Sequence, residues 1–253
     1  MHRFYLDPRD WSSATLRGSE AHHARAVLRL KPGDRIVLFD GRGREATGKI
    51  TGVHSDSVEV CVLQEIVTPP LRARISLAQA IPKGKNMDLI VQKAVELGAS
   101  EIFPLLSDRT IVHLEEKSAA QKQAKWQLVA IEAAKQCGQN WLPQVRTPRV
   151  PHDFFRRIEA GESAFDLRLI GSLQPGARHL KEILGEYAQG HKGNRPASVL
   201  MIIGPEGDFT PAEIALARSY GCQPLTLGPI ILRVETAAIY CLSVLSYELL
   251  GAG

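Results

Sequence analysis

The chain has 253 residues, enough for one or two domains with hydrophobic cores. Hydrophobic residues make up 44% and charged residues 23% of it, close to the globular average, which excludes a disordered chain, a collagen-like fibre and a coiled-coil rod. No apolar run approaches the roughly 20 residues of a membrane span, and the N-terminus lacks a secretion signal. We therefore expect a cytoplasmic protein, whose net charge of +4 permits an anionic partner.

The first 70 residues have the pattern of a small antiparallel β-barrel. A helix is expected over 20–30, followed by a turn at 31–34 and by strands at 35–39, 45–53 and 57–66. Six Lys or Arg against two Asp make the stretch 22–44 locally positive. Contacts to RNA phosphates are predicted for His22, Arg25, Arg29, Lys31, Arg42 and Arg44. An ordinary solvated face is the alternative.

The sequence 68–70, Thr-Pro-Pro, cannot continue a strand or a helix, so we place the domain boundary there, between 1–70 and 71–253. The second domain alternates apolar strands with amphipathic helices, which is typical of a mostly parallel α/β sheet. Strands are expected at 74–80, 101–106, 166–170, 198–203 and 223–227. Helices are expected at 86–97, 118–137, 152–159, 178–187, 211–220 and 236–250.

Several familiar motifs are absent or rejected. The stretch 41–46 matches a dinucleotide-binding fingerprint, but a β-rich segment follows it where that site needs a helix, so we interpret it as a hairpin turn. No phosphate-binding loop, zinc-peptidase motif or hydrolase nucleophile elbow occurs. The four cysteines, Cys61, Cys137, Cys222 and Cys241, have no metal-ligand spacing, which favours reduced, buried thiols and no metal.

Three glycine-containing loops follow predicted strands near the C-terminus. They begin at Gly171, at Gly204 and at Leu227-Gly228, and the second leads into a helix with a capping box, Thr210 to Glu213. Because ligands of open α/β sheets bind beyond the carboxyl ends of strands, these loops predict one pocket, with Ile203, Ile231 and Leu232 among its walls. Little charge is present, so an uncharged purine fits better than a polyphosphate. Plain β–α turns are the alternative.

The C-terminal motifs, Gly204-Pro-Glu-Gly207 and Ile231-Leu-Arg-Val-Glu-Thr-Ala237, resemble those of the bacterial 16S ribosomal RNA uridine-N3 methyltransferase family, within the SPOUT superfamily of knotted methyltransferases. The resemblance extends through 93–98, 108–109, 132–136 and the opening Arg3-Phe4. It implies a PUA-like RNA-binding barrel, an α/β domain with a trefoil knot, S-adenosylmethionine as methyl donor, 16S ribosomal RNA or the small subunit as partner, and a homodimer. Cofactor binding is then expected at Gly171, Ile203, Gly204, Glu206, Gly207, Leu227, Gly228, Ile231 and Leu232.

Arg233 and Glu235 are the candidate catalytic residues. Arg233 is expected to offset negative charge on uracil or to hold a phosphate, and Glu235 to act as a base or to hydrogen-bond backbone at the start of the last helix. Glu206 has a structural alternative. Further RNA contacts are predicted for Lys83, Lys85 and Arg109, whereas Lys93 and Glu96 are expected to form an i,i+3 ion pair.

The sequence departs from the family at three places: Asp208 stands where glycine is expected, Gln139-Asn-Trp141 where an arginine is common, and Ile230 where arginine is frequent. The last helix is apolar around most of its circumference, which favours burial in its own core or in a dimer interface. A non-catalytic RNA-binding scaffold, and a methyltransferase acting on another RNA nucleotide, are the alternative functions.

Overall fold

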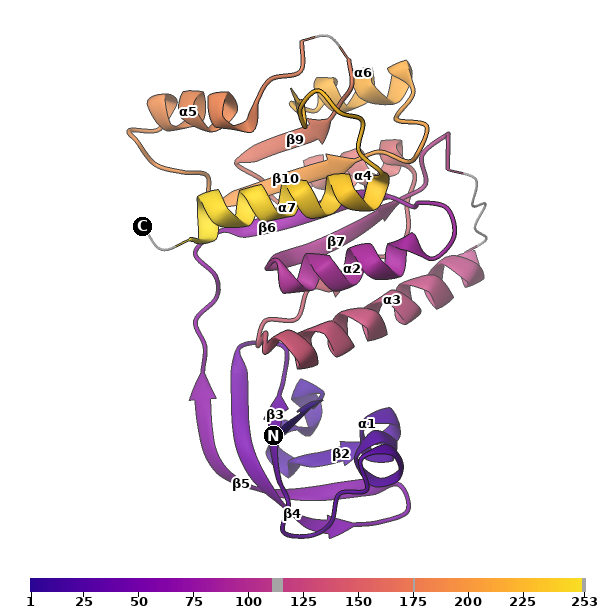
Figure 1. The fold of residues 1–253 in the computed structure, drawn as a ribbon, viewed down its shortest axis with the longest axis vertical. Helices are drawn as coiled ribbons and strands as arrows, with labels where there is room; N and C mark the ends of the chain where they lie inside the picture. Colours follow the sequence, from indigo (N-terminus) through magenta and orange to yellow (C-terminus); the bar gives the residue numbers. More distant parts are fainter. Residues whose placement is uncertain (111–115, 175, 252–253) are drawn as a thin grey trace. The chain divides into compact units, whose positions relative to one another are not determined.

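The structure, a computed structural model, describes residues 1–110, 116–174 and 176–251 (Figure 1). The chain divides into two compact units. The first comprises Met1–Pro70 and Ile131–Leu142, and the second comprises Leu71–Ala130 and Pro143–Gly253. The sequence places 131–142 in the second domain, whereas the structure includes it in the first unit. Among the described residues, the helices are too short or too polar to cross a membrane.

The sheet of the first unit has the strand order β1-β3-β4-β5-β2. Its strands are β1 (His2–Tyr5), β2 (Thr15–Arg17), β3 (Arg35–Phe39), β4 (Arg44–Val53) and β5 (Ser57–Val67). The pairs β3–β4, β4–β5 and β5–β2 are antiparallel as predicted, but β1 pairs parallel to β3, which an antiparallel barrel does not include. Register shifts bend the β4–β5 ribbon, whose curl is visible in Figure 1.

Short helical segments close this sheet: η1 (Pro8–Ser13), α1 (Gly18–His22) and the π-helical η2 (His23–Val27). The predicted helix 20–30 therefore ends early. Arg29 has a φ of 53°, a left-handed conformation that cannot continue a right-handed helix. The stretch 41–44 is the turn between β3 and β4, as expected, and not a nucleotide-binding loop.

Ion pairs and hydrogen bonds hold residues 131–142 within the first unit. The Arg3 guanidinium lies 2.5 Å from a Glu45 carboxylate oxygen, donates to the Asn140 side chain and stacks over the Phe39 ring. The ammonium group of the largely buried Lys135 lies 3.1 Å from Glu20 Oε1. These contacts join motif residues that lie far apart in the sequence, so Arg3 and Lys135 have a structural role in the first unit.

The sheet of the second unit is parallel throughout its described pairs, with the order β11-β9-β10-β6-β7-β8. Its strands are β6 (Arg74–Ala80), β7 (Ala99–Leu105), β8 (Gln144–Val145), β9 (Leu167–Gly171), β10 (Ser198–Ile203) and β11 (Gln223–Leu225). All residues of β10 are buried, because a central parallel strand is covered on both faces. The predicted α/β class is confirmed.

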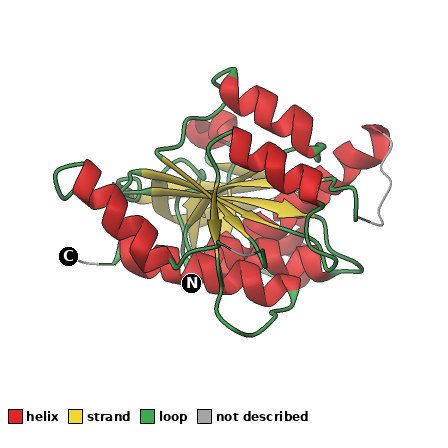
Figure 2. Cartoon of the chain, turned by 90° about the horizontal axis from the view of Figure 1, so that it is seen from above, coloured by secondary structure: helices red, strands yellow, loops and turns green. Residues whose placement is uncertain are grey.

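Helices cover both faces of this sheet, as the view from above shows (Figure 2). They are α2 (Asn86–Glu96), α3 (Glu116–Cys137), α4 (Pro151–Glu159), α5 (Leu180–Gly190), α6 (Pro211–Ser219) and α7 (Val234–Leu250). Side chains of α4 and α6 form one core with alternate residues of β6 and β10. On the other face α7 packs against β6, β10 and α2. The last helix is thus buried along one side in its own core.

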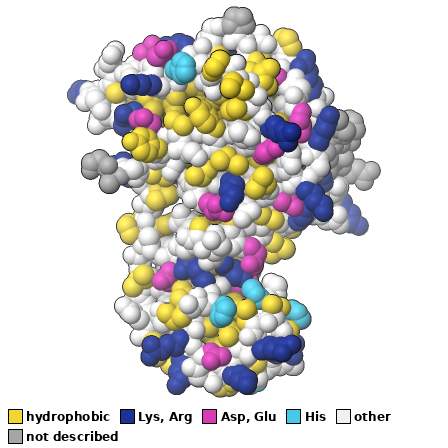
Figure 3. All heavy atoms as spheres, in the orientation of Figure 1, with side chains coloured by type: hydrophobic (Ala, Val, Ile, Leu, Met, Phe, Trp, Pro, Cys, Tyr) yellow, Lys and Arg dark blue, Asp and Glu magenta, His cyan; other side chains and the backbone are white. Residues whose placement is uncertain are grey.

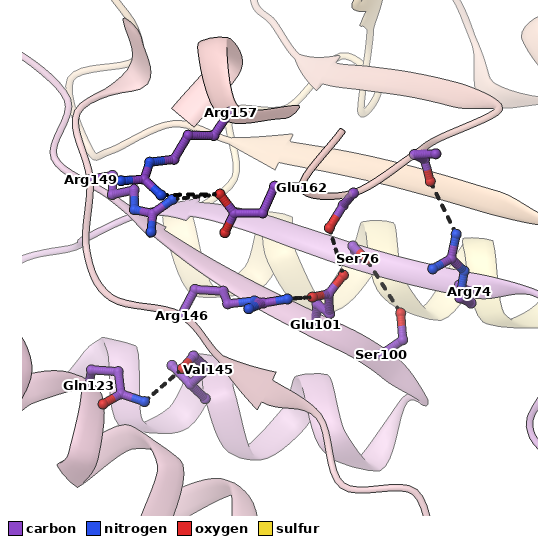
Figure 4. Close-up of polar contacts among 12 residues, drawn as sticks. Arg74, Ser76, Ser100, Glu101, Gln123, Val145, Arg146, Arg149, Arg157 and Glu162 are labelled. Carbon is purple, nitrogen blue, oxygen red and sulfur yellow. Dashed lines mark hydrogen bonds and ion pairs between the residues drawn. The ribbon is translucent and has the colours of Figure 1, made fainter. Parts of the chain in front are cut away.

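Polar contacts fasten the β7–β8 edge of the sheet (Figure 4). Arg146 pairs with Glu101 of β7 at 2.5 Å, and the Ser163 hydroxyl donates to the same carboxylate. Arg149 and Arg157 both pair with Glu162. Since these groups pair with one another, we assign them a structural role.

The four cysteines are free. Cys222 and Cys241 are buried, and burial raises the pKa of each thiol to about 12, so both are inert. Cys61 and Cys137 are exposed, which corrects the expectation that all four are buried. Both lie in stretches of exposed residues, 61–67 in β5 and 136–138 at the end of α3.

Candidate active site

A cavity of about 580 Å³ lies beyond the carboxyl ends of β9, β10 and β11, within the size range of small-molecule sites. The loops after these strands and the first turn of α7 line it. Its lining includes every residue predicted for the cofactor and for catalysis: Gly171, Ile203, Gly204, Glu206, Gly207, Leu227, Gly228, Ile231, Leu232, Arg233 and Glu235. The structure thus brings the three glycine loops together.

At two positions of the cavity lining, the backbone geometry explains why the residue is glycine. Gly228 has a φ of 105°, which side chains other than glycine rarely adopt. A Cβ on Gly204 would lie 3.2 Å from the Phe209 ring, tighter than ordinary packing allows. Both glycines line the cavity, where the lack of a side chain lets a ligand approach the backbone closely.

The loop 204–207 is held from two sides. The Glu206 carboxylate accepts a hydrogen bond from the backbone N–H of Lys83 at 2.8 Å. The Arg109 guanidinium donates to the carbonyl of Gly207, and a Cβ on that glycine would lie 3.3 Å from Arg109 Cδ. Glu206 thus has a structural contact, the alternative role considered for it.

Arg233 and Glu235 stand at the start of α7. Arg233 is the N-cap residue; its side chain makes no capping hydrogen bond and is exposed. The half-buried Glu235 accepts a hydrogen bond from the Asn86 side chain at 3.3 Å, a contact that joins the first turns of α7 and α2. Asn86 also lines the cavity. Sequence reasoning missed Asn86 because it considered the loop before α2 only for RNA contacts, through Lys83 and Lys85.

The RNA-contact candidates of the first unit differ in exposure and in the contacts that their side chains already make. His22, Arg25, Arg29, Lys31 and Arg42 are exposed. Arg44 is half-buried, pairs with the buried Asp40 at 2.7 Å and lies over the Trp11 ring, so its side chain is already engaged. In Figure 3 basic side chains occupy several separate places on the visible face of this unit.

The RNA-contact candidates of the second unit lie beside the cavity loops. Lys83 and Lys85 are exposed and flank Gly84. Arg109 is exposed too, but its guanidinium rests on Gly207. Lys93 and Glu96 form the predicted i,i+3 ion pair at 2.8 Å. Among the described residues, no cluster of three His, Cys, Asp or Glu side chains is arranged to hold a metal ion.

The chain matches two family models of known proteins. The model of an RNA methyltransferase domain covers residues 69–246, and the model of the RNA methyltransferase PUA domain covers residues 16–63. The chain belongs to this RNA methyltransferase family. The resemblance of its C-terminal motifs to such enzymes is thereby confirmed.

Relatives of this RNA methyltransferase span nearly its whole length. The ribosomal RNA small subunit methyltransferase E of Bacillus subtilis is 31% identical over 92% of this chain and 90% of its own. The Synechocystis protein of the same name is 33% identical over 92% of this chain and 72% of its own. The solved structure of the Neisseria gonorrhoeae protein of that name, bound to S-adenosyl methionine, has a TM-score of 0.82 at 31% identity and covers 98% of both chains. A putative methyltransferase from Legionella pneumophila, in complex with the same cofactor, also reaches 0.82, at 33% identity and 98% coverage of both chains.

The structure explains the departure of this RNA methyltransferase at Asp208. Its φ is 59°, a left-handed conformation that glycine adopts most readily and aspartate better than most residues. The Asp208 carboxylate accepts a hydrogen bond from the N–H of Phe209 at 2.8 Å, which supports the turn locally.

Substituting Asp208 tests this explanation. Asp208→Gly is expected to change the free energy of unfolding by less than about 1 kcal/mol, because relief of the left-handed conformation offsets the lost hydrogen bond. Asp208→Val is expected to lower it by about 2 kcal/mol, since a β-branched side chain fits this conformation poorly. Urea denaturation measures both, and equal tolerance of valine and glycine would contradict the explanation.

The other two departures lie in different settings. Asn140 donates to the Thr68 hydroxyl at 2.7 Å, and the Trp141 indole donates to the Thr68 carbonyl at 3.0 Å, so this segment is part of the first unit's framework. Ile230 is 72% exposed and lines the cavity. An apolar side chain thus stands at the cavity at this position.

Proposed function

We propose that this chain methylates N3 of a uridine in the 16S ribosomal RNA of the small subunit, with S-adenosylmethionine as methyl donor. The observation that carries the proposal is the cavity formed by the three glycine loops, in a chain of the RNA methyltransferase family. The names of its relatives and the cofactor bound in two similar solved structures support the substrate and the donor.

The cavity residues fit S-adenosylmethionine. Ile203, Leu227 and Leu232 offer apolar contacts to an adenine ring, while the glycines at 171, 204, 207 and 228 let the ligand approach the backbone closely. When bound, this cofactor supplies a methyl group activated by its sulfonium charge. We therefore assign cofactor binding to the nine predicted lining residues other than Arg233 and Glu235.

Arg233 and Glu235 have the chemistry that the acceptor requires. Uridine N3 carries a proton and is a poor nucleophile until that proton leaves, so the protein must help remove it. We assign proton removal to the Glu235 carboxylate, which Asn86 orients. We assign to Arg233 the stabilisation of the negative charge that spreads onto uracil O2 and O4.

Basic residues of both units would hold the RNA. The PUA-type domain, which we place in 1–70, offers the exposed side chains of His22, Arg25, Arg29, Lys31 and Arg42, together with Arg44, which Asp40 holds. In the methyltransferase domain, which we place in 71–253, Lys83, Lys85 and Arg109 lie on loops beside the cavity. Phosphate contacts of this kind make the affinity for RNA fall with salt.

A homodimer in the cytoplasm, where ribosomes are, completes the proposal. Apolar side chains gather on the face of the second unit that carries α7 (Figure 3). Tyr240 and Tyr247 of α7 are 49% and 81% exposed, and such aromatic side chains are typical of interfaces. The trefoil knot implied by the resemblance stays a prediction.

Calorimetric titration with S-adenosylmethionine, with NAD as the control ligand, tests the cofactor part. The proposal expects saturable binding of the first and none of the second. Binding of neither, with RNA present as well as absent, would favour the non-catalytic scaffold.

A further inference from the structure

A buried carboxylate on α6 contacts the turn that follows β7. Glu213 is 7% exposed and stands in the first turn of α6. Its Oε2 accepts hydrogen bonds from the N–H of Thr210 at 2.8 Å and from the hydroxyl of Thr210 at 3.0 Å. These contacts belong to the predicted capping box, and they account for the hydrogen bonds of one carboxylate oxygen within the helix cap.

The remaining contacts of Glu213 leave the helix. Its Oε1 accepts a hydrogen bond from the N–H of Asp108 at 3.0 Å, and its Oε2 lies 3.4 Å from the Ser107 hydroxyl. Both partners belong to the turn that follows β7, which is closed by the hydrogen bond from Thr110 N–H to the Ser107 carbonyl at 2.8 Å. A helix cap alone does not require these bonds.

The same turn carries Arg109, whose guanidinium donates to the carbonyl of Gly207 in the cavity loop. A continuous series of contacts therefore runs from Glu213 through Asp108 and Arg109 to the cavity lining. We propose that Glu213 is a positioning residue for the cofactor: it fixes the turn 107–110 so that Arg109 holds the loop 204–207 in its binding conformation. This inference rests on the proposed function, because it takes S-adenosylmethionine as the ligand.

A carboxylate is needed because it only accepts hydrogen bonds, and donors approach both of its oxygens. In Glu213→Gln the amide oxygen can keep the bond from Thr210 N–H, as glutamine does in capping boxes. The amide NH₂ then faces the N–H of Asp108, so that bond is lost. The substitution keeps the cap and breaks the connection to the turn.

The test measures the Kd for S-adenosylmethionine by calorimetry without RNA, together with methyl transfer at saturating cofactor. Glu213→Gln is expected to raise the Kd about tenfold, the effect of losing one charge-assisted hydrogen bond, with kcat nearly unchanged. Arg109→Ala, an exposed substitution that leaves the core intact, is expected to raise it similarly. The double variant should bind the cofactor no more weakly than either single variant, because the two substitutions break the same series of contacts.

Thr210→Ala is the matched control, since it removes the hydroxyl of the cap and leaves the Asp108 contact in place. It is expected to lower the thermal midpoint with the Kd unchanged. A Kd raised equally by Thr210→Ala and Glu213→Gln, or additive losses in the double variant, would overturn the inference. Failure of the wild-type protein to bind the cofactor or to transfer methyl would instead contradict the proposed function.

Discussion

Replacing Arg233 by alanine is expected to lower the rate of methyl transfer about 100-fold or more. When uridine N3 loses its proton, negative charge spreads onto the uracil oxygens, and a fixed cation beside the cavity stabilises it. Arg233 lines the cavity at the start of α7 and is exposed, so its guanidinium is available to a substrate. Removing one such donor typically lowers kcat by roughly 10²–10³-fold.

Single-turnover rates at saturating S-adenosylmethionine measure this effect, with the cofactor Kd determined in parallel. We expect the Kd of Arg233→Ala to stay within about twofold, because the apolar walls and glycine backbones are assigned to cofactor binding. Arg218→Ala, an exposed arginine on α6 outside the cavity lining, is the matched control. Turnover at the wild-type rate would remove Arg233 from the mechanism.

The second large effect is expected from replacing Lys135, which should lower the free energy of unfolding. Its side chain is 7% exposed and pairs with Glu20, whose side chain is 13% exposed, and also with Glu132 at 2.8 Å. Lys135→Met would leave the Glu20 carboxylate buried without its cation, and such a loss typically lowers the free energy of unfolding by about 3 kcal/mol. Urea denaturation measures the loss, with the exposed Lys117→Met on the same helix as the control.

The pH dependence of this loss identifies its cause. Burial raises the pKa of Glu20 above its ordinary value of 4.5, and Lys135 opposes that rise. Without Lys135 the folded state binds the proton more tightly than the unfolded state, so the destabilisation should be largest at neutral pH and shrink as pH falls toward 4.5. Adding Glu20→Gln to Lys135→Met should recover much of the stability at neutral pH. A loss that is independent of pH and unrelieved by Glu20→Gln would point to packing instead.

The bounds of β3, β6 and β10 match the predicted strands 35–39, 74–80 and 198–203. In β10 the apolar run was decisive, because a central parallel strand is covered on both faces. The strands β1, β2 and β8 have two to four residues, too few for a periodic pattern, and the sequence analysis missed them. The early end of the first helix depends on the backbone conformation of Arg29, which residue type does not reveal.

The cavity was predictable because parallel strands bring their carboxyl ends to one edge, so three glycine loops there must lie close together. Contacts between distant segments were not predictable. No local pattern places Asn140 beside Arg3, or joins Glu213 to the turn at Asp108, because each contact depends on how the whole unit folds. The capping box predicted only one part of the role of Glu213.

The most direct test of the central proposal is transfer of an isotopically labelled methyl group from S-adenosylmethionine to small ribosomal subunits and to naked 16S ribosomal RNA. Both substrates should come from cells in which this gene is deleted, so that the acceptor is unmethylated. After digestion to nucleosides, mass spectrometry should find the label in 3-methyluridine from at least one of the two substrates. Label in a different nucleoside, or none in either RNA from a protein that binds the cofactor, would contradict the account.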